Sequence, residues 1–317
     1  MRMRRSRTLA VLLALLGAAG CSGWEGEPEP AADCSATGDT MGAVVTQVTF
    51  GKLLDDDTAE GLDLDGHDTA EGEEAGCYKQ DFVSPDGRRG IDNQLAKLLP
   101  VVDEVVGTEN LDALLEGAIA NGQLLIMLAV AGVDDPMNDD CVDLRLGAGL
   151  GTPFLDTEGN YVPYQTFGFD ERETPSSAIV KARIEDGVLV AEAGRVILPV
   201  TILDADFDLD LAFAGARLRV QPDPLGGGLR LSGLMGGGIV VKDFEGIVAG
   251  LTVGADVVGA IVPLLSGLAD LEPDEEGVCQ RVSAALEFET TPAFLYEGEP
   301  PEPKDEPIEG EADASGD

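Results

Sequence analysis

The alternation of apolar and polar residues in the second half of the chain most constrains its fold. Residues 205–220, ADFDLDLAFAGARLRV, alternate aspartates with large apolar side chains. Successive side chains of a β-strand point to opposite faces, so this stretch predicts a strand with one buried and one hydrated face. The predicted buried face carries Phe207, Leu209, Leu211 and Phe213, and the hydrated face carries Asp206, Asp208 and Asp210.

Residues 177–243 contain several such stretches, separated by glycines. Glycine marks turns because it adopts backbone conformations that other residues avoid. We expect turns at Gly187, Gly194, Gly215 and residues 226–228. The stretch LGGGLRLSGLMGGGIVV, residues 225–241, lacks the lysine of a phosphate-binding loop and predicts two strands with glycine turns. Together these features predict an antiparallel meander.

Other periodicities add helices and further strands. Apolar residues spaced by three and four predict a helical segment near residues 91–120, kinked or divided at Pro100. Residues 123–133 and 141–147 predict paired strands joined by a turn at 134–140, and residues 281–295 predict a final strand. The apolar segment 244–271 predicts a core helix, since Asp256 and Pro263 disfavour a membrane span. The expected fold class is mainly β, of the α+β type, with antiparallel strands.

The N-terminus predicts an export signal. Four arginines within residues 1–7 precede an apolar run of about 12 residues, shorter than the roughly 20 of a membrane-spanning helix. The sequence GAAGC that follows resembles the lipobox of bacterial lipoproteins, in which the cysteine is acylated and becomes the new N-terminus. The resemblance implies a signal peptide over residues 1–20 and lipidation of Cys21. Ala18 departs from the usual leucine, so cleavage by an ordinary secretory peptidase, leaving a plain thiol at Cys21, stays open.

The cysteine count favours lipidation. With Cys21 acylated, an even number of cysteines is left for disulfides in an oxidising compartment: Cys34, Cys77, Cys141 and Cys279. These four allow three pairings. Acyl chains would anchor the protein to a membrane without crossing it. Ser22 stands where inner-membrane lipoproteins usually have aspartate, which favours the outer membrane.

Both ends of the chain differ in composition from its centre. Residues 21–42 predict a flexible acidic spacer that follows the lipidated cysteine. Residues 297–317 hold nine acidic residues and four prolines, too polar to bury a core, and predict a disordered tail. Residues 43–296 are expected to form a single β-rich domain.

The net charge of the chain argues against nucleic acid as a partner. Removing residues 1–20 takes four of the 20 basic residues, so 16 remain against 60 acidic residues and the net charge is −44. A field of this sign repels nucleic acid and attracts divalent cations. We expect no nucleic-acid partner, a membrane contact through the lipid anchor, and a protein or polysaccharide partner of unknown identity.

Four stretches carry a further resemblance. GLDLDG, CYKQDFVSPDGRRGIDNQLA, GVDDPMNDD and CQRVSAALEF together resemble an uncharacterised family of secreted bacterial lipoproteins. The resemblance would span most of residues 43–296 and implies an exported, singly folded unit. It implies no activity.

The stretch GLDLDGHD, residues 61–68, resembles half of a calcium-binding loop. Asp63, Asp65 and Gly66 occupy positions 3, 5 and 6 of an EF-hand-type loop that begins at Gly61. Glycines stand at positions 1 and 12, so both end ligands are missing. A self-contained EF-hand is therefore not expected.

The missing ligands are expected from the segment that follows. We predict a composite site with Ca²⁺ as its cofactor, formed by Asp63, Asp65, Asp81, Asp86, Asp92 and Asn93. The alternative is that these residues form turns and caps, with Asp92 accepting free backbone N–H groups at a helix start. A second acidic cluster within residues 134–140 fits a turn better than a metal site.

Catalytic patterns are weak. His67 is the only histidine, no G-x-S-x-G motif is present and the cysteines are too scattered for a usual zinc site. A surface position suits His67 best. Paired carboxylates of a glycosidase stay open, although the single tryptophan, Trp24, lies in the spacer.

The expected protein is a non-enzymatic, membrane-anchored acidic lipoprotein with a calcium-stabilised interaction or structural module. The alternatives are a carboxylate-dependent hydrolase of extracellular polymer and a lipid-carrier-like β domain. Two facing carboxylates in a closed pocket would favour the hydrolase. A dry apolar cavity of several hundred cubic ångströms would favour the carrier.

Overall fold

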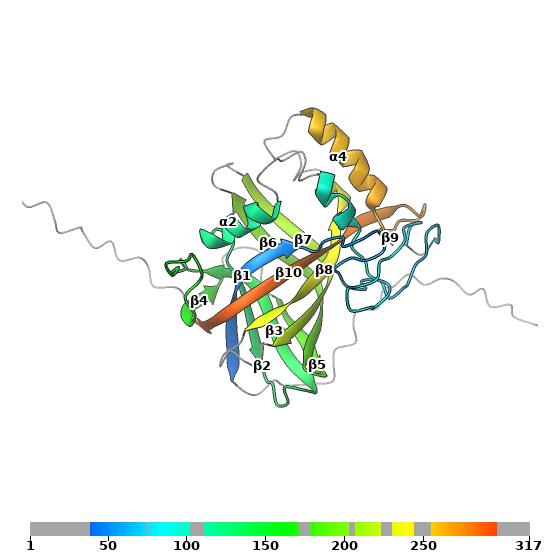
Figure 1. Ribbon diagram of the computed structural model, residues 1–317. Helices are drawn as coiled ribbons and strands as arrows, with labels where there is room; N and C mark the ends of the chain where they lie inside the picture. Colours follow the sequence, from blue (N-terminus) through cyan, green and yellow to red (C-terminus); the bar gives the residue numbers. More distant parts are fainter. Residues whose placement is uncertain are drawn as a thin grey trace, which may run out of the picture. The chain divides into compact units, whose positions relative to one another are not determined.

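A computed structural model of the chain describes residues 39–74, 76–101, 111–170, 178–202, 207–222, 230–243 and 255–296. The predicted signal peptide, Cys21, Cys34 and the C-terminal tail lie outside these residues. Within them, eight antiparallel strands form a closed barrel, because the first strand pairs with the last (Figure 1). These strands are β1 (Thr40–Phe50), β2 (Ile126–Ala131), β3 (Asp139–Leu150), β5 (Ala178–Glu185), β6 (Val188–Ile202), β7 (Phe207–Pro222), β8 (Leu231–Val240) and β10 (Cys279–Leu295).

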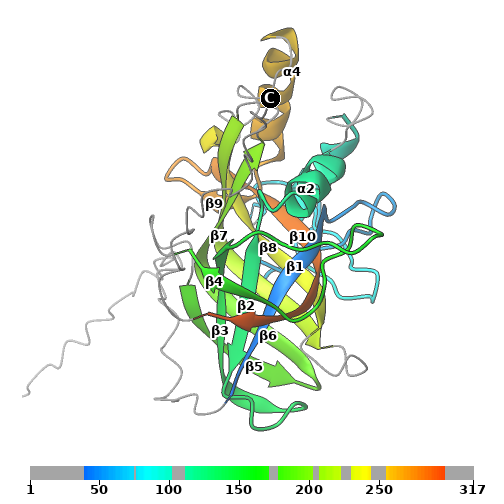
Figure 2. The ribbon, with the colours of Figure 1, turned by 90° about the vertical axis from the view of Figure 1, so that its left-hand side faces the viewer.

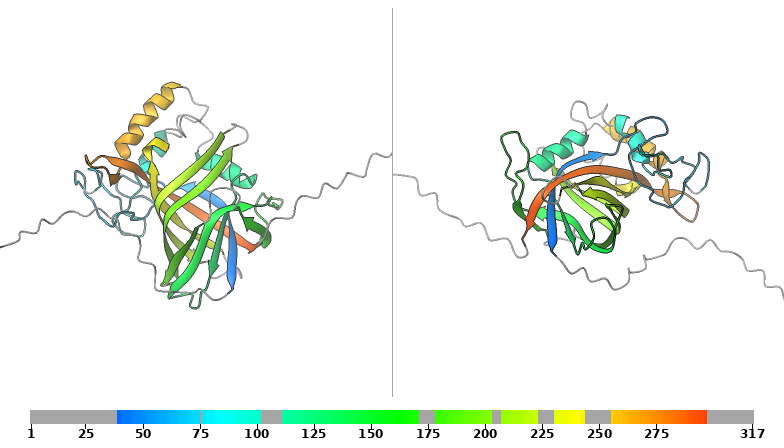
Figure 3. Two further views of the ribbon diagram at one scale, coloured as in Figure 1. Left: turned by 180° about the vertical axis from the view of Figure 1, so that it is seen from behind. Right: turned by 60° about the horizontal axis from the view of Figure 1, so that its bottom comes forward.

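The order of these strands in the barrel follows the sequence, as the predicted meander requires. Each strand pairs with the next, from β1–β2 through β8–β10. The barrel closes where Phe50 of β1 pairs with Leu286 of β10. Figures 2 and 3 show the strands wrapping around one interior. The predicted fold class, mainly β with antiparallel strands and few helices, is confirmed.

The remaining elements lie around the barrel. Strand β4 (Gln165–Phe169) pairs with the ends of β3 and β10, and β9 (Leu271–Pro273) forms a hairpin with β10. The helices are the 3-10 helix η1 (Gln94–Lys97), α2 (Leu111–Ala120) and α4 (Ala255–Leu268). Among the described residues, no helix is both long enough and apolar enough to cross a membrane.

The predicted alternation in β7 is seen where its side chains are described. Leu211, Phe213 and Leu218 are buried, while Arg217 and Arg219 lie on the outer face. The side chains of residues 207–210, and the whole of Asp206, lie outside the described part. Apolar side chains from all eight strands contribute to one core.

Two of the expected turns are instead places where long strands bend. Gly187 does form the β5–β6 turn, with a positive φ of 78°. Gly194 lies inside β6 and Gly215 inside β7, and their neighbours pair across the two strands. The register of β7 shifts between Ala214 and Arg217, which marks a bulge. The bulge shifts the alternation by one residue, so that Ala216, Leu218 and Val220 face the interior. Glycine therefore marks a bend in the barrel wall here, not a chain reversal.

The second glycine cluster is also part of a strand. Gly236, Gly237 and Gly238 lie within β8, so only the first cluster, residues 226–228, remains a candidate turn, and it lies outside the described residues. A Cβ atom at Gly237 would lie 2.9 Å from Cβ of Phe213, and one at Gly236 would lie 3.2 Å from Leu64. These glycines let neighbouring chain segments approach the barrel wall closely.

The helical predictions hold in part. Helix α2 and strands β2 and β3 match the expected segments, and residues 102–110 lie outside the described part. Helix α4 was expected in the core, but it lies at one end of the barrel (Figure 1). Its Leu265 is fully buried, whereas Leu264 is 46% exposed. An apolar segment with several glycines can pack by one face only, which hydropathy alone does not reveal.

The described apolar side chains leave little space inside the barrel. The cavity enclosed by apolar residues such as Val48, Leu128, Leu218 and Met235 has a volume of about 20 Å³. That is room for about one water molecule, compared with the roughly 300–1,000 Å³ of typical ligand sites. Among the described residues, this interior space is far smaller than the large dry cavity that would favour a lipid carrier.

Candidate metal site

A long excursion from the barrel, residues 51–93, carries all the predicted metal ligands; we call it the β1–η1 loop. It is held by isolated bridges, including Leu62 with Asp92 and Phe82 with Ile91. A small apolar cluster of Ala59, Phe82 and Ile91 packs inside it. The loop lies beside β8, β9 and β10 (Figure 1).

Three of the six predicted ligands converge. One carboxylate oxygen from each of Asp63, Asp65 and Asp92 lies within 4.8 Å of the others. Gly66 adopts a φ of 84°, and its N–H donates to Oδ1 of Asp63 at 2.6 Å. This sharp turn brings the first two carboxylates together, and the bridge from Leu62 to Asp92 brings the third. Asp92 thus comes from the segment expected to complete the half loop.

Asp92 is the buried member of the group. Only 1% of its surface is exposed, and its Oδ2 accepts a hydrogen bond from the N–H of Leu64 at 2.6 Å. The alternative role predicted for Asp92, accepting a free N–H group at the start of the helix, is taken by Ser283. The N–H of Gln94 in η1 donates to Oγ of Ser283 at 2.8 Å.

Two further buried aspartates extend the group. Asp81, the fourth predicted ligand, accepts the N–H of Thr69 at 2.7 Å and lies in hydrogen-bonding contact with Asp92. Asp270 accepts both the N–H of Ser283, at 2.8 Å, and its hydroxyl, at 2.5 Å. Asp81 and Asp270 are 8% and 2% exposed.

The crowding of these carboxylates raises their pKa values. Burial raises the pKa of Asp92 to about 9, and the nearby charges of Asp65, Asp270 and Asp81 add to the effect. Burial likewise raises the pKa of Asp270 to about 7 and that of Asp81 in the same direction. Without a cation, Asp92 therefore binds a proton at neutral pH. A divalent cation would compete with that proton for the same oxygens.

Positive charge near the group is limited. Arg217 of β7 donates to the backbone carbonyl of Asp63 at 2.6 Å, while its guanidinium lies 3.8 Å from the Asp63 carboxylate. Lys97 donates to Gln94 at 2.8 Å, and its burial lowers its pKa although the nearby charge of Asp270 acts in the opposite direction. The Arg217 contact attaches the loop to the barrel, and Asp65 and Asp92 have no ion pair among the described residues.

The other two predicted ligands lie elsewhere. Nε of Arg88 donates to both oxygens of the Asp86 carboxylate at 3.0 Å. The hydrogen bond from the Ser84 hydroxyl, followed by these contacts with Arg88, lowers the pKa of Asp86. The amide of Asn93 donates to the carbonyls of Gly51, at 3.0 Å, and Glu60, at 2.7 Å. Asp86 therefore shapes a turn, and Asn93 fastens the two ends of the loop.

The second acidic cluster forms the expected turn between β2 and β3. Oδ2 of Asp139 accepts the N–H of Asp134 at 2.7 Å, and Asp135 accepts that of Met137 at 2.8 Å. His67 is exposed, as expected. Its carbonyl lies against Gly90, where an added Cβ atom would be only 2.3 Å away.

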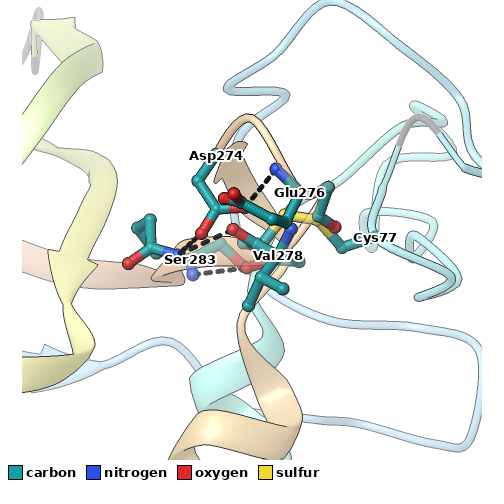
Figure 4. The surroundings of a disulfide bond; sticks show 9 residues. Cys77, Asp274, Glu276, Val278 and Ser283 are labelled. Carbon is teal, nitrogen blue, oxygen red and sulfur yellow. Dashed lines mark hydrogen bonds between the residues drawn. A yellow bond between two sulfur atoms is a disulfide. The ribbon is translucent and has the colours of Figure 1, made fainter.

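A disulfide joins the β1–η1 loop to the β9–β10 hairpin. Cys77 pairs with Cys279, with Cα atoms 6.0 Å apart and a sequence separation of 202 (Figure 4). In the hairpin turn beside it, Asp274 accepts the N–H groups of Glu276 and Val278. Cys141 is disulfide-bonded as well. Since the other described cysteines pair with each other, the partner of Cys141 lies outside the described residues.

Asp270 and Ser283 were not expected from the sequence. Asp270 follows the apolar helix α4, and Ser283 lies within β10 among buried residues. Neither belongs to a recognisable motif. A buried acid beside an apolar segment is the one weak signal of a polar network, because such a group requires partners.

Four exposed aromatic residues lie at or beside the paired ends of β4 and β10, and we call them the β4/β10 aromatic surface: Phe154, whose N–H donates to Gln165, Tyr164, Phe294 and Tyr296. The rings of Tyr164 and Phe294 have centroids 5.9 Å apart. Phe154 is 76% exposed and Phe294 is 59% exposed. Exposed apolar groups gathered in one place are typical of interaction surfaces.

Comparison with protein-family models, with curated proteins and with solved structures finds no match to this chain.

Proposed function

We propose that this protein is a lipid-anchored, calcium-stabilised interaction module of the cell envelope, and not an enzyme. The convergence of Asp63, Asp65 and Asp92 carries the proposal. Calcium prefers carboxylate and carbonyl oxygens and tolerates irregular geometry, which suits two half-exposed and one buried carboxylate. Water would complete the coordination on the exposed side.

Calcium would act by fixing the β1–η1 loop. Its ligands come from both halves of the loop, so a bound ion would join residues 63–65 to Asp92 and, through Arg217, to the barrel. The metal would neutralise carboxylates that otherwise repel one another. Stabilisation by a ligand that binds only the folded state grows with ligand concentration.

Export and anchoring rest on the N-terminal sequence. We propose that Cys21 carries the lipid and that Cys34 is the partner of Cys141, since Cys77 and Cys279 pair with each other. The spacer would then hold the barrel away from an outer-membrane surface. The β4/β10 aromatic surface supports an interaction role, with a protein or polysaccharide as partner.

Calcium titration tests the metal proposal. We expect the chelator-treated protein to bind one Ca²⁺ by calorimetry, and its Tm to rise by roughly 5–10 °C when calcium exceeds Kd about 100-fold. An Asp65→Asn variant should lose most of this response. Asp86→Asn is the matched control, because it removes a carboxylate of the same loop outside the group. No heat and no Tm rise at millimolar calcium would refute the proposal.

A further inference from the structure

A cleft of about 460 Å³ lies between the outer face of the barrel and the β1–η1 loop. Its volume falls within the roughly 300–1,000 Å³ typical of small-ligand sites. It is distinct from the carboxylate group described above, since none of Asp63, Asp65 and Asp92 lines it. We call it the outer-face cleft. The residues that line it include Gln47, Glu289, Ser232, Gln221, Glu287 and Arg219.

The floor of the cleft follows from the register of four strands. Gln47 of β1 pairs with Glu289 of β10, Glu289 pairs with Ser232 of β8, and Ser232 pairs with Gln221 of β7. Directly opposed residues on neighbouring strands share a face of the sheet. All four are exposed. One continuous row of amide, carboxylate and hydroxyl groups therefore runs along the outer face of the barrel, across four neighbouring strands.

A second row runs beside the first. Thr49 pairs with Glu287, Glu287 pairs with Leu234, and Leu234 pairs with Arg219. All four are half-buried. With strands about 4.8 Å apart, the backbones at Glu287 and Arg219 lie about 10 Å apart, on two sides of the cleft.

The polar groups of the cleft are of both kinds. The amides of Gln47 and Gln221 and the hydroxyl of Ser232 each donate and accept hydrogen bonds, whereas the carboxylates of Glu287 and Glu289 accept them. The guanidinium of Arg219 donates only, and no ion-pair partner for it lies in the described part of the chain. A ligand that meets such a floor needs groups that both donate and accept, and a hydroxyl group does so.

Charge and shape narrow the ligand class further. The chain's net negative charge repels anions. The cleft itself holds charges of both signs, since Arg88 is paired with Asp86 and Arg219 lies across β8 from Glu287. Leu234 and Pro85 add apolar contacts that suit the C–H face of a sugar ring. We propose that the outer-face cleft binds a neutral polyhydroxylated ligand, one to three units of a neutral glycan.

One pair of carboxyl groups in the cleft lacks the spacing that glycoside hydrolysis requires. The carboxyl groups of Glu60 and Glu287 are in hydrogen-bonding contact, and burial together with this neighbour raises the pKa of Glu287. Glycosidases hold their two carboxyl groups roughly 5–9.5 Å apart, wider than a hydrogen bond. Glu60 and Glu287 therefore lie too close together to act as the two catalytic carboxyl groups of a glycosidase.

Calorimetry with defined probes tests this inference. The full mature protein is titrated with maltotriose, cellotriose and tri-N-acetylchitotriose, and with spermidine and citrate as charged probes. We expect one of the sugars to bind with 1:1 stoichiometry and a Kd of about 1 mM or tighter. Arg219→Ala and Gln221→Ala should each weaken binding at least tenfold.

Arg195→Ala is the matched control, because Arg195 is another arginine of the barrel wall but does not line the cleft. It should bind the sugar as the unchanged protein does. The inference is overturned if no sugar gives heat, if only spermidine or citrate binds, or if Arg195→Ala weakens binding as much as Arg219→Ala. Circular dichroism of each variant separates loss of fold from loss of the site.

Discussion

Asp92 accepts a hydrogen bond from the N–H of Leu64 at 2.6 Å, and this contact joins the two halves of the β1–η1 loop. The two residues are 28 positions apart in sequence. Because Leu64 lies between Asp63 and Asp65, the bond fixes both of those side chains around the buried carboxyl group. The order of the loop and the chemistry of its carboxylates therefore depend on each other.

The burial of Asp92 and Asp270 predicts that, without calcium, the free energy of unfolding falls as pH rises. The pKa of Asp92 is raised from 3.8 to about 9 and that of Asp270 from 3.8 to about 7, so the folded state holds protons that the unfolded chain releases. Their contribution is fully present below pH 3.8. The contribution of Asp270 is lost by about pH 7, and that of Asp92 is lost by about pH 9. Each group adds a slope of about 1.4 kcal/mol per pH unit within its window.

Urea unfolding in chelator at pH 5, 6, 7 and 8 measures this slope. Asp92→Asn should reduce it, because an amide does not titrate, and added calcium should reduce it in the unchanged protein, because the ion replaces the proton. Carboxylates with lowered pKa values, such as Asp86, oppose the trend only at low pH. An unchanged slope in Asp92→Asn would show that the raised pKa of this group does not govern stability.

The disulfide predicts a second effect on stability. Cys77 and Cys279 close a loop of 202 residues, so their removal increases the conformational freedom of the unfolded chain. We expect a Cys77→Ser/Cys279→Ser double variant to lose roughly 2–5 kcal/mol of unfolding free energy. Chemical unfolding of both proteins under non-reducing conditions gives the difference. A loss below about 1 kcal/mol would mean that the loop is held by its other contacts alone.

The sequence predicts the class of fold but not the closure of the barrel. The alternation around Leu211 and Phe213 is local, and it correctly indicates a strand in a meander. The pairing of Phe50 with Leu286 joins segments more than 230 residues apart, and no local pattern encodes it. Gly194 and Gly215 were assigned to turns because a glycine that bends a long strand has the same local signal as one that reverses the chain.

Part of the candidate site can likewise be predicted from local sequence, and part of it depends on the tertiary fold. Asp63 and Asp65 are neighbours, and Asp92 follows within the same loop, so a short-range argument finds them. Asp86 has equally suitable chemistry, but the turn that Ser84 and Arg88 build around it directs its carboxylate elsewhere. Asp270 reaches the group only because β10 carries Ser283 beside it, which is a consequence of the tertiary fold.

Cysteine mapping tests the anchor. We expect peptide mapping under non-reducing conditions to find Cys34 linked to Cys141, alongside the Cys77–Cys279 pair. Mass spectrometry of the membrane-extracted protein should find an acylated Cys21 at the new N-terminus. A disulfide between Cys21 and Cys141 would contradict lipidation, because an acylated thiol cannot form one.

Two glycines of the β1–η1 loop offer a test of its geometry that removes no carboxylate. Gly90 and Gly87 both have positive φ values, 71° and 88°, so alanine introduces similar backbone strain at each. A Cβ atom at Gly90 would lie 2.3 Å from the carbonyl oxygen of His67, whereas one at Gly87 would have no atom within 4 Å. Gly90→Ala must therefore push residues 67–68 away from the segment that carries Asp92. We expect its calcium affinity to fall at least tenfold by calorimetry, while Gly87→Ala retains the original affinity. Equal affinities in the two variants would show that the spacing between these segments does not set calcium binding.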